Sequence, residues 1–146
     1  DTAFYLKAIP FLKKIDYEPG EYVYHFLRSG STMNSKNNKR VENIFPVLSN
    51  AIEFYKKNHF WDKYNKELEY FCVKILLCSS LKRMCKIKDK TIREKLLTES
   101  WERLKLNFPN WKENIILKTV NIGKNKYMRT VNKSTYKIYS KILEII

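Results

Sequence analysis

The sequence predicts a mainly α-helical fold, and three observations support this prediction. Apolar residues make up 44% of the 146-residue chain and aromatic residues 14%, which is enough to build a hydrophobic core. The chain has only three glycines and four prolines, whereas an all-β fold of this length needs many turn residues. Most apolar residues recur every three or four positions, as they do along one face of a helix.

The N-terminal part of the chain mixes helical and strand signals. Residues 2–12 are predicted to form a short helix. Its apolar stripe consists of Phe4, Ala8, Phe11 and Leu12. Pro19 and Gly20 fit the two central positions of a type II turn. The aromatic run 22–27 follows this turn and is typical of strands, so we expect a small β hairpin or two short strands here.

A polar stretch rich in Ser and Asn, residues 29–38, is the best candidate for a boundary. It divides the chain into an N-terminal segment, residues 1–34, and a helical C-terminal region, residues 35–146. Everything after the boundary has helical spacing, which predicts a helical bundle.

Five helices are expected after the boundary, over about residues 37–58, 60–86, 91–108, 110–120 and 134–146. Pro46 either kinks the first of them or begins a new helix. Thr91 and Glu94 form a capping-box pattern at the start of the third helix, and Asn110 is expected to cap the fourth. Gly123 is expected to interrupt the chain before the last helix.

Cysteines and tryptophans both lie in the expected helices. Cys72, Cys78 and Cys85 have no histidine at ligand spacing, so they are interpreted as buried thiols rather than zinc ligands. The tryptophans lie at core-like spacing and are interpreted first as packing residues and second as sugar platforms. They are Trp61, Trp101 and Trp111.

The formal charge of +14 suggests an anionic partner. However, 23 of the 29 basic residues are lysines, which is typical of an AT-rich genome, and arginine is the better residue for bidentate phosphate contacts. Nucleic acid is therefore disfavoured. Lys133, Lys137 and Lys141 share one face of the last helix, opposite its apolar stripe. This face is either a solvated surface or a surface that rests on an anionic membrane.

A candidate binding cluster follows the aromatic run. Arg28 offers a planar donor fork, Gly30 a flexible backbone, and Ser31 and Thr32 two hydroxyls. Such a cluster can hold a phosphate or a sugar, and the alternative is an ordinary polar loop after a strand. His25 stands between two aromatic residues and is either near this site or a packing residue.

Four segments of the N-terminal region occur in a recognisable order. They are Asp1-Thr2-Ala3-Phe4, Ile15-Asp16-Tyr17, Tyr22-Val23-Tyr24 and Arg28-Ser29-Gly30-Ser31. In this order they resemble the end of the catalytic domain of bacterial family 2 glycosyltransferases. In many members a Glu-Asp pair opens a helix, a strand with a Tyr-x-Tyr pattern follows, and an Arg precedes a flexible loop with a Ser. The resemblance covers about residues 1–34.

The resemblance implies a GT-A fold that binds a nucleotide sugar with Mn²⁺ or Mg²⁺ and transfers the sugar with inversion. It implies that Asp1 is the general base on the acceptor hydroxyl, although Asp1 is equally well explained as a helix cap. Arg28, Ser31 and Thr32 match the loop that lies near the donor diphosphate and acceptor, and His25 is a further candidate for substrate contact.

The chain also departs from the family pattern. The Glu before Asp1, the Asp-x-Asp metal motif and the nucleotide-binding strands are expected upstream, so this fragment is expected to hold no metal or cofactor and to be inactive alone. Through the missing N-terminal domain, the partners would be a nucleotide-sugar donor and a glycan or lipid-linked acceptor of cell-surface polysaccharide biosynthesis. Peripheral contact with the inner face of the cell membrane, from a cytoplasmic location, and homo-oligomerisation are further expectations.

The alternative hypothesis is a free-standing basic helical module. Such a module would bind nucleic acid, protein or an anionic membrane surface, or it would oligomerise. It rests on the net charge alone.

Overall fold

The computed structural model of the chain describes residues 2–16, 18–20 and 39–145. Their regular structure is helical throughout and includes no strand, which confirms the mainly α class. Residues 15, 16 and 18–20 form no strand. The second arm of the expected hairpin, residues 22–27, lies outside the described part. Neither the small hairpin nor a remnant of a GT-A domain is supported by the described residues.

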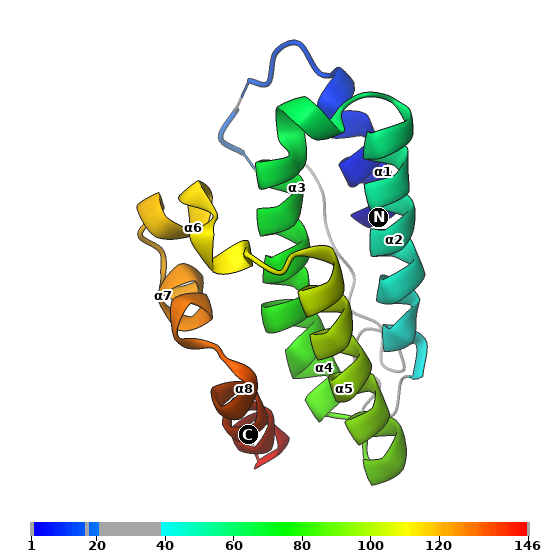
Figure 1. The fold of residues 1–146 in the computed structure, drawn as a ribbon, viewed down its shortest axis with the longest axis vertical. Helices are drawn as coiled ribbons and strands as arrows, with labels where there is room; N and C mark the ends of the chain where they lie inside the picture. The colour runs from blue at the N-terminus through cyan, green and yellow to red at the C-terminus, as the bar shows by residue number, and fades with distance from the viewer. Residues whose placement is uncertain (1, 17, 21–38, 146) are drawn as a thin grey trace.

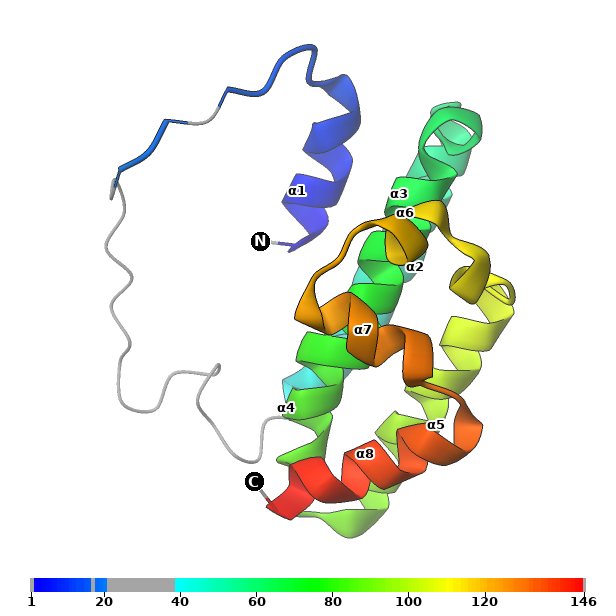
Figure 2. The ribbon, with the colours of Figure 1, turned by 90° about the vertical axis from the view of Figure 1, so that its left-hand side faces the viewer.

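The described residues form eight α-helices: α1 (Thr2–Ala8), α2 (Ile44–Lys57), α3 (Trp61–Lys74), α4 (Leu81–Cys85), α5 (Lys90–Asn107), α6 (Ile115–Thr119), α7 (Gly123–Thr130) and α8 (Lys133–Ile145). A π-helical stretch, Ile75–Ser80, joins α3 to α4, and short 3-10 helices cover Ile9–Phe11, Lys39–Asn43 and Trp111–Glu113. The α2, α3–α4 and α5 segments run side by side in alternating directions (Figure 1). Figure 2 shows α6, α7 and α8 following one another along one side of these long helices.

The hydrophobic core lies between the long helices and extends beneath α6–α8. Its fully buried members include Leu68, Leu77, Leu81, Met84, Leu104, Leu117, Met128 and Val131. Residues from α3 through α8 thus share one core, which explains why the short helices α6 and α7 are held in place. Helices of this length are marginal in isolation and depend on such tertiary packing.

The start of α2 shows which of the two alternatives for Pro46 is correct. The helix begins at Ile44, so Pro46 lies in its first turn, where a backbone N–H has no partner within the helix. Of the two alternatives for Pro46, the start of a new helix is confirmed. At the other end His59 has a φ of 60°, and the Phe60 N–H donates to the Tyr55 carbonyl at 2.9 Å. A left-handed residue after the last turn is a common helix ending.

The helix expected over residues 60–86 exists, but the apolar face predicted from its spacing is partly wrong. That predicted face consists of Phe60, Tyr64, Leu68, Phe71, Ile75 and Cys78. Phe71 belongs to that face and is 41% exposed. The buried positions instead recur every four residues, at Leu68, Cys72, Leu76, Ser80 and Met84. An α-helix has 3.6 residues per turn, so positions four residues apart move gradually around its surface. The π-helical stretch has more residues per turn and keeps these positions on one side of the helix.

The cysteines are free thiols inside this helical segment. Cys72 and Cys85 are buried, as predicted, and Cys78 is half-buried. Burial raises the pKa of Cys72 and of Cys85 to about 12, so both thiols stay protonated at neutral pH. They act as small apolar packing groups.

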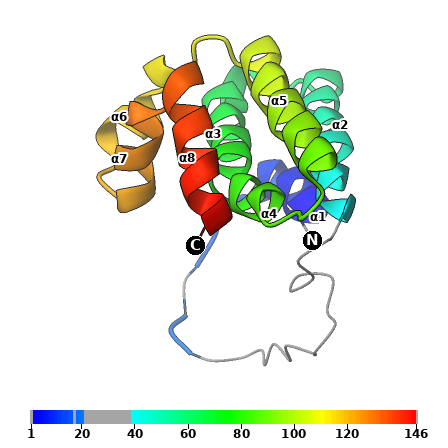
Figure 3. The same ribbon diagram turned by 90° about the horizontal axis from the view of Figure 1, so that it is seen from below.

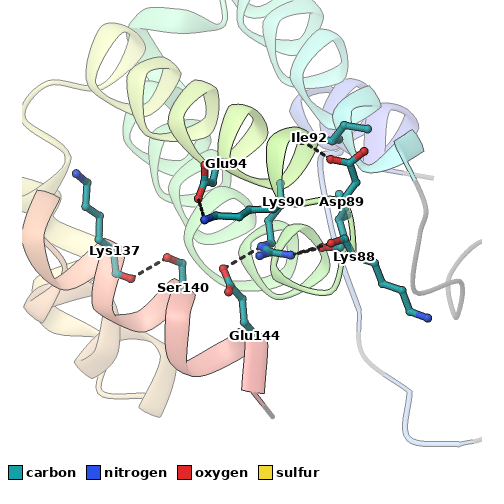
Figure 4. Close-up of polar contacts among 10 residues, drawn as sticks. Lys88, Asp89, Lys90, Ile92, Glu94, Lys137, Ser140 and Glu144 are labelled. Carbon is teal, nitrogen blue, oxygen red and sulfur yellow. Dashed lines mark hydrogen bonds and ion pairs between the residues drawn. The ribbon is translucent and has the colours of Figure 1, made fainter.

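The predicted caps are wrong by a few residues. The start of α5 is capped by Asp89, not Thr91, because an Asp89 carboxylate oxygen accepts the Ile92 N–H at 3.0 Å (Figure 4). The start of α6 is capped by Asn114, not Asn110. Gly123 does not simply interrupt the chain but is the first residue of α7, a helix that sequence reasoning missed.

Asn114 is the centre of a buried polar network between α3 and α6. Its side-chain N–H₂ donates to Glu69 Oε2 at 2.7 Å and to the Lys66 carbonyl at 2.8 Å, while its oxygen accepts the Ile116 N–H at 3.0 Å. The exposed fraction of Asn114 is 1% and that of Glu69 is 7%. The network therefore gives hydrogen-bond partners both to the buried Glu69 carboxylate and to the Ile116 N–H, which has no partner within its helix.

We expect Asn114→Ala to destabilise the fold strongly. Loss of the partner leaves the buried Glu69 carboxylate without this donor, which costs about 1–3 kcal/mol, and loss of the cap costs about 1 kcal/mol more. Urea unfolding measures the change in free energy. Asn110→Ala is the matched control, because Asn110 is exposed and caps no helix, and it should stay within about 0.5 kcal/mol of the parent. Equal losses for the two variants would contradict the assignment of the cap.

Candidate functional site

The five residues predicted to form the catalytic and substrate site lie outside the described part of the chain. They are Asp1, His25, Arg28, Ser31 and Thr32. Their arrangement therefore stays a prediction. Two features of the described residues are relevant to function: the N-terminal helix α1 and a groove between α5 and α8.

Helix α1 is attached to the helical body by one side only. Leu6 is 3% exposed and joins the hydrophobic core, and α1 packs along α2 (Figure 2). The Lys7 ammonium lies 5.5 Å from the centre of the Phe54 ring, a cation–π distance. After α1, the Phe11 ring lies edge-on to the Phe60 ring with 4.9 Å between centroids. The N-terminal helix is thus held on the end of the α2–α3 hairpin.

Several apolar side chains of this segment are exposed, and we call five of them together the α1 face. It consists of Phe4, Tyr5, Ile9, Leu12 and Ile15. Phe4 is 66% exposed and Ile15 is 73% exposed. The helix predicted over residues 2–12 is confirmed, but its predicted apolar stripe is not a single packing face. Phe4 and Leu12 are exposed, Phe11 packs on Phe60, and the buried Leu6 lies outside the stripe. Large apolar side chains that are exposed within one segment are candidates for an interaction surface.

The groove lies between α5 and α8, which are seen side by side in Figure 3. Its volume is ≈ 710 Å³, within the range of ligand-binding clefts. Leu97 and Trp101 from α5 and Tyr136 from α8 form its apolar lining. The Trp101 and Tyr136 rings pack with centroids 5.0 Å apart, and the Tyr136 hydroxyl donates to the Leu97 carbonyl at 3.3 Å. These contacts fix the aromatic lining on two rigid helices.

Charges of opposite sign line the two walls of the groove. The α5 wall carries Glu94 and Glu102, with Lys105 at its C-terminal end, and these residues are spaced along one helix face. The α8 wall carries three lysines, spaced four residues apart: Lys133, Lys137 and Lys141. Figure 4 shows Glu94 on α5 and Lys137 on α8 on the two sides.

One end of the groove is closed by an ion pair between the helices. Arg93 Nε lies 2.9 Å from Glu144 Oε1, and Arg93 Nη1 donates to the Ile87 carbonyl at 2.6 Å. Along the rest of the groove, within the part of the chain that the structure describes, Glu102 and the three α8 lysines form no ion pair. The two charged walls therefore face the groove without neutralising each other.

The structure changes the interpretation of α8. Its lysines were expected to face away from the apolar side of the helix, but they line the groove beside Tyr136 and Ser140. The side of α8 turned away from the core carries exposed isoleucines instead. They are Ile138, Ile142 and Ile145. The regular spacing of the lysines was visible in the sequence, whereas the opposing wall on α5 depends on how the two helices are placed.

Comparison of the chain with known protein families found no match. Comparisons with curated proteins and with solved structures also found no similar protein. The function is therefore argued from the residues and from the geometry of the described helices.

Proposed function

We propose that the chain is the helical C-terminal part of an inverting family 2 glycosyltransferase, which transfers a sugar from a nucleotide-sugar donor to a glycan or lipid-linked acceptor. The observation that carries the proposal is the ordered series of segments from Asp1 to Ser31. A catalytic domain upstream of Asp1 would supply the donor site and the Mn²⁺ or Mg²⁺ ion. The helical region would support the catalytic helix and contribute to acceptor binding.

The position of α1 supports this proposal. The helix begins at Thr2, directly after the residue proposed as the base. The first N–H groups of a helix have no partners within it and favour a carboxylate at this end. A base at Asp1 would therefore be held at the junction between the catalytic domain and the helical region.

The exposed α1 face supports the proposal in a second way. α1 packs on the helical body through Leu6, whereas Phe4 and Tyr5 of α1 and Ile15 after it are exposed. In the proposed enzyme α1 belongs to the catalytic domain, so the apolar face would be covered by that domain. This arrangement would fix the helical region rigidly against the active site.

Contact with a membrane surface is part of the same proposal. No helix among the described residues is long and apolar enough to cross a bilayer. The exposed Ile138, Ile142 and Ile145 give α8 an apolar outer side that is separate from the groove lining. A helix with an exposed apolar side can lie in the interface of a membrane, where lipid-linked acceptors are found.

The experiment that tests the proposal is nucleotide release by a polypeptide extended upstream of Asp1 by about 200 residues, roughly one further domain. We expect release from at least one nucleotide sugar in the presence of Mn²⁺ or Mg²⁺ and none in EDTA. The chain of 146 residues alone is the control and should release nothing. Absence of both donor binding and release in the extended polypeptide, tested with uridine, guanosine and thymidine diphosphate sugars, would refute the proposal.

A further inference from the structure

The α5–α8 groove has features that a simple helix–helix contact does not have. Its two walls carry opposite charges, yet Glu102 on α5 and the lysines on α8 form no ion pair within the described chain. Close packing of α8 against α5 would bring these charges together, as Arg93 and Glu144 are brought together at the closed end. The open part of the groove keeps the charged walls apart and leaves both available to a ligand.

The lysine wall defines one requirement for the ligand. Lys133, Lys137 and Lys141 are four residues apart, so their positions on α8 advance by roughly 6 Å at each step. A row of this kind suits a linear molecule with several anionic groups rather than a single small anion. The lining extends along α8 from Lys133 to Glu144, so an extended molecule can lie in the groove.

The α5 wall and the aromatic lining define two further requirements. Glu102 accepts hydrogen bonds but repels anions, so the ligand must also present donors on its other side. Trp101 offers an apolar ring surface in the lining of the groove. The ligand must therefore combine anionic groups, hydrogen-bond donors and an apolar face.

A carbohydrate chain with acidic groups meets all of these requirements. Its carboxylates or phosphates suit the lysines, its hydroxyls donate to Glu102, and the C–H face of a sugar ring packs on an aromatic side chain. Nucleic acid and acidic peptides bring the anionic groups but offer few hydroxyl donors for Glu102. We infer that the groove between α5 and α8 binds an anionic glycan chain.

The identification of this glycan as an acceptor rests on the proposed transferase function, whereas binding itself is a property of the described helices. In that role the groove would hold the growing chain at a distance from the reacting end. Binding energy from a remote part of the acceptor would then help to orient its terminal hydroxyl.

Binding of a defined acidic glycan by the 146-residue chain tests this inference. The probe is a linear oligogalacturonate, compared with neutral dextran and with polyglutamate of the same charge. Calorimetric titration at moderate salt should show binding of oligogalacturonate, with weaker binding of polyglutamate and none of dextran. Equal affinity for oligogalacturonate and polyglutamate would overturn the inference, because it would show binding by charge alone.

The lysine wall is tested by replacing Lys133, Lys137 and Lys141 together with Gln. We expect the affinity for oligogalacturonate to fall about tenfold or more, since three ion pairs are lost. The charge-matched control replaces Lys57, Lys82 and Lys86, which are exposed on other helices and form no described ion pair. Equal losses in the two triple variants would mean that the net charge, not the groove, binds the glycan.

The variant Glu102→Gln distinguishes specific binding of a glycan in the groove from binding of any polyanion by net positive charge. The substitution removes a negative charge, so attraction of a polyanion by net charge alone predicts tighter binding. Loss of a strong acceptor for sugar hydroxyls instead predicts several-fold weaker binding, which is the result we expect. Trp101→Leu, which keeps an apolar side chain but removes the aromatic ring surface from the lining, should also weaken binding, and far-UV circular dichroism checks that each variant folds.

The outcomes distinguish this inference from the transferase proposal. Groove-dependent binding together with no nucleotide release by the extended polypeptide would retain the glycan site and reject the enzyme. Nucleotide release without groove-dependent binding would retain the enzyme and reject the glycan site. Binding to anionic vesicles in place of oligogalacturonate, lost in the triple Lys variant of α8, would overturn the glycan site and assign these lysines to a membrane surface.

Discussion

Asp1→Asn in the extended polypeptide is expected to lower kcat by about 10²–10⁴-fold, the range typical of general-base catalysis. Asparagine has the shape of aspartate but cannot take the proton from the acceptor hydroxyl. Because donor binding would depend on upstream residues, KM for the nucleotide sugar should change little. Initial-rate kinetics of nucleotide release, with donor and acceptor varied separately, measure both quantities.

Asp16→Asn is the matched control for this substitution. Asp16 is exposed and pairs with Lys14 at 3.0 Å, and the change in charge and shape is the same. We expect this variant to keep the parent kcat, because an exposed ion pair contributes little. Full activity in Asp1→Asn, with donor binding retained, would leave the family assignment in place and reject Asp1 as the base.

Leu104→Ala is expected to destabilise the helical region by about 2–5 kcal/mol, the range for a buried leucine whose removal leaves a cavity. Leu104 has an exposed fraction of 0% and lies in the middle of the shared core. The loss is large relative to the 5–15 kcal/mol that stabilises a typical domain. Urea unfolding followed by tryptophan fluorescence and by circular dichroism measures it.

Leu106→Ala provides the comparison on the same helix. Leu106 lies two residues further along α5 and is 81% exposed, so its removal leaves no cavity. We expect the free energy of unfolding to change by less than about 0.5 kcal/mol. A loss of several kcal/mol in Leu106→Ala would show that the exposed side of α5 is covered by another copy of the chain.

The helical class was predictable because it depends on local spacing. The short N-terminal helix, the break before Ile44 and the long helix that includes Trp101 all follow from apolar periodicity and from proline. Helix boundaries were less predictable, because several residues near each end can cap. Asp89 and Asn114 were overlooked in favour of Thr91 and Asn110, whose sequence patterns are equally good.

Features that depend on tertiary packing could not be read from the sequence. The π-helical stretch Ile75–Ser80 accompanies a four-residue burial pattern, and which side of this stretch is buried depends on tertiary contacts such as those with α5. The α5–α8 groove brings Glu102 and Lys137 to opposite walls although they are 35 positions apart in the sequence. Regular lysine spacing on the last helix was visible, but only the placement of α5 shows what those lysines face.

The most direct test of the transferase proposal is the anomeric configuration of the sugar transferred by the extended polypeptide. Proton NMR of the product, formed from an α-linked nucleotide sugar and an acidic oligosaccharide acceptor, determines this configuration. The proposal predicts a β-linked product, because Asp1 would activate the acceptor for a single displacement. An α-linked product, or no transfer by a polypeptide that binds the donor, would contradict it.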